Sequence, residues 1–173
     1  MTTKRNPNSY SIWMIPTGKK FFMFEKIIFD LSQSFNGIQF IPHVTLISGL
    51  NNSEKILSKK IAKIAKKIMP FNIQLVDIQF LNEFFQSFFI KVKIDSQLRI
   101  LRKIAQKEFP NTEKYFNPHL SLAYGNRNIK FKKRLRKTIQ NPVKNFMVKE
   151  LYLAHNDEIN YKWKVVNKFP IIK

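Results

Sequence analysis

Two histidines occur in matching short segments, and each is followed two positions later by a hydroxyl side chain. The segments read Pro-His-Val-Thr-Leu at 42–46 and Pro-His-Leu-Ser-Leu at 118–122. Short apolar runs of this kind predict strands. Alternate strand residues share a face, so His43 lies beside Thr45 and His119 beside Ser121. If the two strands are neighbours, two imidazoles and two hydroxyls converge on one small volume.

This set of groups suits the hydrolysis of a phosphodiester. Histidine has an unperturbed pKa that allows it to take and to give a proton near neutral pH. Hydroxyls can donate hydrogen bonds to phosphate oxygens as negative charge builds on them. One His-x-Thr segment is a weak signal, but only three histidines occur in 173 residues and two of them lie in these segments. The duplication predicts His43 and His119 as catalytic and Thr45 and Ser121 as phosphate-binding; which histidine is the acid stays open.

At these motifs the sequence resembles the 2H phosphoesterase superfamily, most closely its cyclic phosphodiesterase branch. Members of the branch begin with a strand like residues 10–16, followed by a helix and Pro-His-x-Thr. Later they carry a strand like residues 85–90, the motif Pro-His-x-Ser-Leu-x-Tyr-Gly, here 118–125, and a closing strand like Trp-Lys-Val-Val at 163–166. The similarity runs from residue 9 to about residue 170.

The resemblance implies a fold, an activity and a pocket. The fold is α+β, with two similar lobes, each an antiparallel sheet with helices on its outer face, and the active-site cleft between them. The activity is hydrolysis of ADP-ribose 1″,2″-cyclic phosphate and of nucleoside 2′,3′-cyclic phosphates to 2′-phosphates. A tyrosine at the place of Tyr124 lines the phosphate pocket in this branch, although strand parity puts Tyr124 opposite His119 unless the chain bends at Gly125. Trp13 and Phe85 are further pocket candidates, with core packing as the competing role.

Hydrophobic spacing and breaker residues predict the elements that hold the motifs. Helices are expected over 20–35, from Ser53 or Glu54 to Pro70, from Asp95 or Ser96 to just before Pro110, and in the basic stretch 127–137. Besides the motif strands, strands are expected over 10–15, 71–80, 86–94, 146–154 and 161–169. The partial repetition of this order fits two similar lobes. His155 falls in a turn-like segment, 155–158, where a structural or exposed role is expected.

Composition bounds the remaining choices. The 31 Lys and Arg against 11 Asp and Glu give a net charge of +20, which favours anionic partners. An AT-rich coding sequence would produce the same Lys-, Ile-, Asn- and Phe-rich composition, and charged helix faces are usually solvated. The absence of cysteine excludes disulfides and thiolate ligands. We expect a loose tail at 1–8 and one domain over 9–173, with no membrane span. We also expect no metal or cofactor. The protein is predicted to be a cytoplasmic monomer that acts on a small cyclic phosphate or nucleotide.

Two other functions fit the sequence. The same fold could act on RNA ends or on 2′,5′-linked oligonucleotides, and the positive charge would suit such a substrate. The chain could also be a non-catalytic RNA-binding module in which the histidines only hold strands together. That module would keep salt-sensitive RNA binding after His43→Ala and His119→Ala.

Overall fold

The computed structural model describes residues 8–141 and 143–172 and has an α+β fold. The strands are β1 (Asn8–Met14), β2 (Val44–Leu50), β3 (Phe71–Gln79), β4 (Phe88–Val92), β5 (His119–Ala123), β6 (Asn145–Val148), β7 (Glu150–Asp157) and β8 (Lys162–Pro170). The helices are α1 (Lys19–Phe35), α2 (Glu54–Ala65), α3 (Ser96–Glu108) and α4 (Ile129–Thr138). The four predicted helices are therefore all present.

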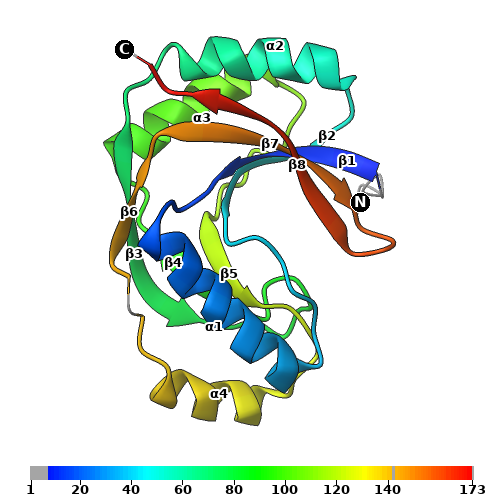
Figure 1. Cartoon of the computed structure of the whole chain (residues 1–173), viewed down its shortest axis with the longest axis vertical. Helices are drawn as coiled ribbons and strands as arrows, with labels where there is room; N and C mark the ends of the chain where they lie inside the picture. The colour runs from blue at the N-terminus through cyan, green and yellow to red at the C-terminus, as the bar shows by residue number, and fades with distance from the viewer. Residues whose placement is uncertain (1–7, 142, 173) are drawn as a thin grey trace.

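The strands form one curled sheet whose centre is made by the two motif strands (Figure 1). Its order is β6-β3-β4-β5-β2-β1-β7-β8, and its paired strands run antiparallel. The strands β5 and β2 are neighbours, with Leu120 opposite Val44. Each half of the sheet contributes one motif strand to this junction. The expected two-lobed α+β fold is confirmed, and its lobes share a continuous sheet.

The helices cover both halves of the sheet. Helix α1 packs against β5, while α2 packs against β7, β8 and α3; Figure 1 shows α2 and α3 at the end of the molecule opposite to α4. The predicted stripe of α2 is buried through Leu57, Ile61 and Ile64. Asp95 caps α3, accepting a hydrogen bond from the Leu98 amide at 2.9 Å. Burial of these apolar stripes is the main force that fixes the helices on the sheet.

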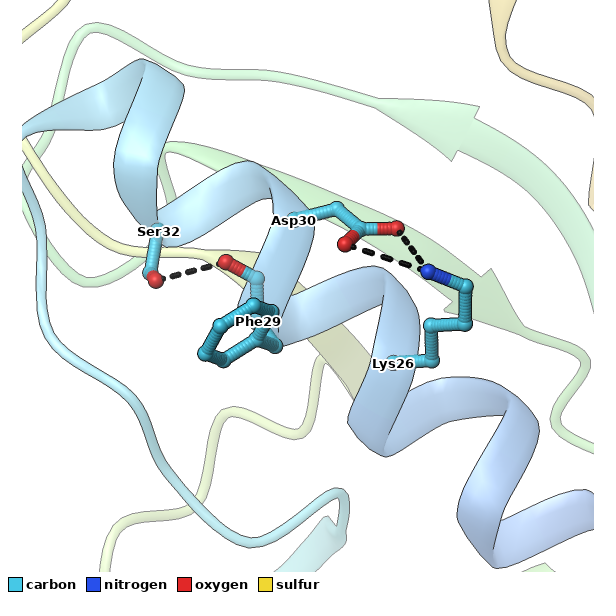
Figure 2. Close-up of polar contacts among 4 residues, drawn as sticks. All are labelled: Lys26, Phe29, Asp30 and Ser32. Atoms are coloured by element: carbon cyan, nitrogen blue, oxygen red, sulfur yellow. Dashed lines mark hydrogen bonds and ion pairs between the residues drawn. The ribbon is translucent and has the colours of Figure 1, made fainter.

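Helix α1 shows how local contacts separate its inner and outer faces (Figure 2). On the outer face, the Lys26 ammonium lies 3.0 Å from an Asp30 carboxylate oxygen, an i,i+4 pair. On the inner face, Ser32 is buried and its hydroxyl donates a hydrogen bond to the Phe29 carbonyl at 2.7 Å. The buried hydroxyl is thus satisfied within the helix, and the neighbouring apolar residues remain free to pack on the sheet.

Two sequence-based expectations are wrong in detail. The strand expected over 146–154 is two strands, because β6 pairs with β3 whereas β7 pairs with β1, at opposite ends of the sheet. The chain changes partner at Lys149, which lies between them. His155 lies within β7, opposite Tyr10, and not in a turn; the turn follows at 158–161.

The tail expected over residues 1–8 lies outside the described residues except for Asn8, which begins β1. Within the described ranges, no helix is long and apolar enough to cross a membrane.

Candidate active site

A cavity of about 500 Å³ lies where the two halves of the sheet meet, and both motifs contribute to it. Its wall contains most of the side chains predicted from the sequence: His43, Thr45, His119, Tyr124, Trp13 and Phe85. Ser121 is the exception, because it is buried and does not line the cavity. The fold therefore brings the two histidines and one of the two hydroxyls to a shared space.

The two imidazoles are held by the same backbone contact. Nδ1 of His43 lies 2.6 Å from the carbonyl oxygen of Ile41, and Nδ1 of His119 lies 2.8 Å from that of Asn117. A carbonyl can only accept, so each Nδ1 carries the proton and donates it. Nε2 of each neutral ring is then left as an acceptor. Each motif thus presents an imidazole in the tautomer that a general base requires.

Burial makes both rings poor proton acceptors in the free protein. It lowers the pKa of His43 to about 4, and the positive charge of His119 adds to this effect. Burial also lowers the pKa of His119. Trp13 contributes to the enclosure of His43, because the two rings stack with their centroids 3.7 Å apart and their planes 14° apart. Both imidazoles are neutral at pH 7, and a bound anion would favour protonation of one of them.

The two motif hydroxyls differ in their surroundings. Thr45 is half-buried and lines the cavity. Ser121 is 4% exposed, and it forms a hydrogen bond with the hydroxyl of Tyr124, which does line the cavity. Burial raises the pKa of Tyr124 to about 12, so its hydroxyl stays protonated and can act as a donor. The second motif therefore reaches the cavity through its histidine and through Tyr124.

Tyr124 faces the cavity because the regular alternation of β5 is broken before it: Phe89 pairs with Ser121 but Phe88 pairs with Ala123, so β5 carries one extra residue there. Strand β5 ends one residue before Tyr124, and Gly125 has φ +133°, a conformation that side chains rarely adopt. The Gly125 amide donates to the Phe84 carbonyl at 3.1 Å, and the Ser87 hydroxyl donates to the Gly125 carbonyl at 2.6 Å. A Cβ at Gly125 would lie 2.8 Å from the Phe35 carbonyl oxygen. The extra residue in β5 changes the alternation between Ser121 and Tyr124, and the turn at Gly125 then ends the strand.

Arg102 is a residue near the site that the sequence reasoning missed. It projects from α3, is 7% exposed, and lines the cavity. Its guanidinium donates to the carbonyls of Leu46, the last residue of the first histidine motif, and Glu113, in the segment before the second. It also lies over the Phe116 ring, 4.8 Å from the centroid. Its position on the apolar stripe of α3, next to Leu101, was the available signal.

The charge inside the cavity contrasts with that of the whole chain. The charged side chains other than histidine in its wall are Glu83, Arg102, Glu113 and Glu158. A chain with a net charge of +20 thus lines this cavity with three carboxylates and one guanidinium. Among residues 8–141 and 143–172, no three His, Asp or Glu side chains are grouped so that they could hold a metal ion.

Solved structures share this fold at low sequence identity. Escherichia coli LigT complexed with 3′-AMP matches with a TM-score of 0.61 at 12% identity, over 97% of this chain and 100% of LigT. LigT complexed with NADP+ gives 0.63 at 12%, over 96% and 99% of the two chains. TT0787 of Thermus thermophilus gives 0.62 at 14%, over 94% and 97%. No curated protein matches the chain in sequence. The family model described as cyclic phosphodiesterase-like protein matches residues 8–173.

Proposed function

Because the chain belongs to the cyclic phosphodiesterase-like family, we propose that it hydrolyses cyclic phosphates on ribose with His43 and His119 as acid and base. The observation that carries this proposal is the matched pair of imidazoles in one cavity, each with its Nδ1 proton given to a backbone carbonyl. The substrates are ADP-ribose 1″,2″-cyclic phosphate and nucleoside 2′,3′-cyclic phosphates. LigT, which shares this fold, binds the nucleotides 3′-AMP and NADP+ in crystal structures.

In the proposed reaction, water attacks phosphorus and one ribose oxygen leaves. Nε2 of the neutral imidazole takes a proton from the water. The other imidazole, which is protonated when the substrate binds, gives its proton to the leaving oxygen. The cyclic diester and one water become a monoester with a free hydroxyl, and the pair of rings ends with the same number of protons. Thr45 donates a hydrogen bond to a non-bridging oxygen, and Ser121 acts on the phosphate directly or through Tyr124.

The active form is the singly protonated pair, because one ring must accept while the other donates. The two pKa values then belong to the pair and not to either ring alone. Both rings of the free protein have lowered pKa values, so the singly protonated pair forms on the acid side of the unperturbed value of 6.5. The maximum of kcat/KM is expected below pH 6.5, since this ratio reports the free enzyme.

The cavity favours a small substrate over a long nucleic acid. A protein that holds an RNA backbone needs cationic side chains along it, whereas this wall holds one arginine, whose guanidinium donates to two backbone carbonyls. The excess positive charge lies elsewhere on the chain. We therefore place hydrolysis of mononucleotide-sized substrates ahead of action on RNA ends.

The test is hydrolysis of 2′,3′-cyclic AMP and ADP-ribose 1″,2″-cyclic phosphate in EDTA, with the products separated by chromatography. We expect conversion to monoesters by the native chain, loss in His43→Ala and His119→Ala, and full activity in His155→Ala. His155 is a matched control because it lies outside the cavity, in β7. Turnover that survives both motif substitutions would contradict the two-histidine mechanism. Oligonucleotides cleaved faster than mononucleotides would favour the RNA alternative.

A further inference from the structure

A second polar group lines the same cavity, away from the histidines. Ser11 and Asn156 are 3% and 6% exposed, and both residues belong to the cavity wall. The Asn156 side-chain amide donates to the Ser11 hydroxyl at 2.5 Å. The other amide atom, Oδ1 of Asn156, is buried and has no hydrogen-bond partner among the described residues.

An unpaired buried amide oxygen is uncommon in a folded protein. Roughly 90% or more of buried polar groups have a partner, because an unsatisfied group loses the hydrogen bonds that water would supply. Here the Ser11 hydroxyl holds one end of the amide, so Oδ1 keeps its direction. Because Asn156 belongs to the cavity wall, a small rotation of its side chain would offer this acceptor to a donor on a ligand in the cavity.

The position of this pair relates it to the histidines. Ser11 is two residues from Trp13 in β1, so both side chains lie on one face about 7 Å apart along the strand. Trp13 in turn stacks on His43. Asn156 is opposite Trp163 in the register of β7 and β8, and Trp163 also lines the cavity. A substrate whose phosphate lies at the histidines would extend its remaining part toward Asn156.

The charge around this pair selects the kind of group it would bind. Glu158, two residues after Asn156, is another acceptor in the wall. The amide oxygen and the carboxylate favour an N–H or O–H donor at this position and disfavour a phosphate bound directly to the pair, where it would bring like charge close to Glu158.

We propose that Ser11 and Asn156 form a second subsite, which binds a hydrogen-bond donor of the substrate while the histidines hold the phosphate. Two sources would supply this chemistry: the exocyclic amino group of a nucleobase, or a hydroxyl of a second ribose. The inference deepens the proposed function and rests on it for the identity of the reacting phosphate. In this proposal Asn156 contributes to selectivity among substrates, and the histidines of the two motifs remain the acid and the base.

The test compares ligand pairs that differ by one donor, using binding as a readout independent of turnover. Adenosine 2′-monophosphate is compared with purine riboside 2′-monophosphate, which lacks the amino group. ADP-ribose is compared with its 2′-deoxyadenosine analogue, which lacks one ribose hydroxyl. Kd values are measured by calorimetry for the native chain, Asn156→Leu, Ser11→Ala and the control Asn167→Leu. Asn167 lies in β8, is exposed and is not part of the cavity wall.

We expect the native chain to prefer one donor-bearing ligand about tenfold, as one hydrogen bond to a buried acceptor would give. Asn156→Leu should remove that preference, Ser11→Ala should reduce it, and Asn167→Leu should keep it. The pair that shows the preference identifies the source of the donor. Ser11→Ala makes the same test with a smaller change, should Asn156→Leu fail to fold as judged by circular dichroism.

Three results would overturn the inference: no preference in either pair, a preference that survives Asn156→Leu, or equal weakening of both members of a pair, which indicates a structural role. The two proposals fail separately. If the native chain binds with the expected preference but hydrolyses no cyclic phosphate, the subsite stands and the proposed function is wrong. If it hydrolyses cyclic phosphates without the preference, only the subsite is wrong.

Discussion

The two copies of the histidine motif share a backbone contact and differ in almost everything around it. Each histidine donates its Nδ1 proton to the carbonyl two residues earlier. The His43 ring is stacked face to face on Trp13 at 3.7 Å, whereas the His119 ring meets Phe89 at 5.1 Å and 62°, an edge contact. The hydroxyl of the first copy lines the cavity, while that of the second is buried behind Tyr124.

The shared contact fixes the tautomer that acid and base catalysis needs, whereas the different surroundings adjust how far each ring is buried. The tautomer of each ring is set locally, by a contact that the short motif carries with it. The enclosure of each ring is set by other strands, β1 for His43 and β4 for His119. Repetition of the motif thus supplies two imidazoles in the same tautomer. The different rings packed on them, Trp13 and Phe89, enclose the two imidazoles to different degrees.

The largest expected effect tests whether the two copies are equivalent in catalysis. His43→Ala and His119→Ala should each lower kcat on 2′,3′-cyclic AMP by about 10³-fold, as loss of a general acid or base does. The double variant should fall little further, because the two rings act as one unit. Steady-state kinetics in EDTA measures this. A large loss in only one single variant would mean that the copies are not a catalytic pair.

The next effect concerns Arg102, which links the first motif to the segment before the second. Arg102→Met should lower the free energy of unfolding by about 2–4 kcal/mol, because two carbonyls in or near the cavity wall, those of Leu46 and Glu113, lose a charged donor. Urea unfolding measures it. The matched control is Arg136→Met, whose guanidinium lies 3.6 Å from Asp77 in an exposed pair and should matter by about 0.5 kcal/mol or less. An equal loss of unfolding free energy in Arg102→Met and Arg136→Met would contradict a linking role for Arg102.

The fold was largely predictable because its signals are local. The stripe of α2, the Asp95 cap and the paired motifs are all written within a few residues, and the resemblance to the 2H phosphoesterases is confirmed by the family match. Long-range features were harder. The split between β6 and β7 depends on which strand each finds as partner, and the unpaired oxygen of Asn156 depends on β1 and β7 meeting. No pattern along the chain contains such pairings.

Within the site, too, the features set by neighbouring residues were predictable and those set by distant segments were not. Strand alternation predicted that His43 and Thr45 share a face, and both residues line the cavity; it made the same prediction for His119 and Ser121, but Ser121 is buried outside the wall. Alternation alone did not place Tyr124, because β5 carries one extra residue between Ser121 and Ala123 relative to its partner β4. Arg102 was missed because charged residues of an amphipathic helix are usually assigned to its solvated face, although its position four residues after Leu98 puts it on the buried stripe.

A smaller effect compares the two hydroxyls. Thr45→Val should lower kcat about 10²-fold, as loss of a donor to a charged transition state does. Ser121→Ala should cost about tenfold if its hydroxyl acts through Tyr124, and Ser121→Ala combined with Tyr124→Phe should then cost no more than Tyr124→Phe alone. Steady-state kinetics on the same substrate decides between the roles. Equal losses at Thr45 and Ser121, with an additive double variant, would make Ser121 a direct donor to the phosphate.

The smallest effect tests the unequal enclosure through pH. The folded-state pKa of His43 is about 4, below its unperturbed value of 6.5, so between these values the unfolded chain binds a proton that the folded chain does not. The stabilising contribution of the neutral ring is therefore complete above pH 6.5 and is lost as the pH falls toward 4. Trp13→Leu opens the ring to water and should raise the pKa of His43 by about one unit, or ~1.4 kcal/mol.

The measurement is an NMR titration of the imidazole protons, which follows each ring separately in the folded protein. Phe89→Leu is the matched change in the second copy, and it should raise the pKa of His119 while leaving that of His43 nearly unchanged. The sharpest outcome is a crossed pattern, in which each substitution moves only the ring it contacts. If Trp13→Leu left His43 titrating near 4, the stacked indole would not be the source of its enclosure, and burial by the motif strands themselves would have to set the pKa in both copies.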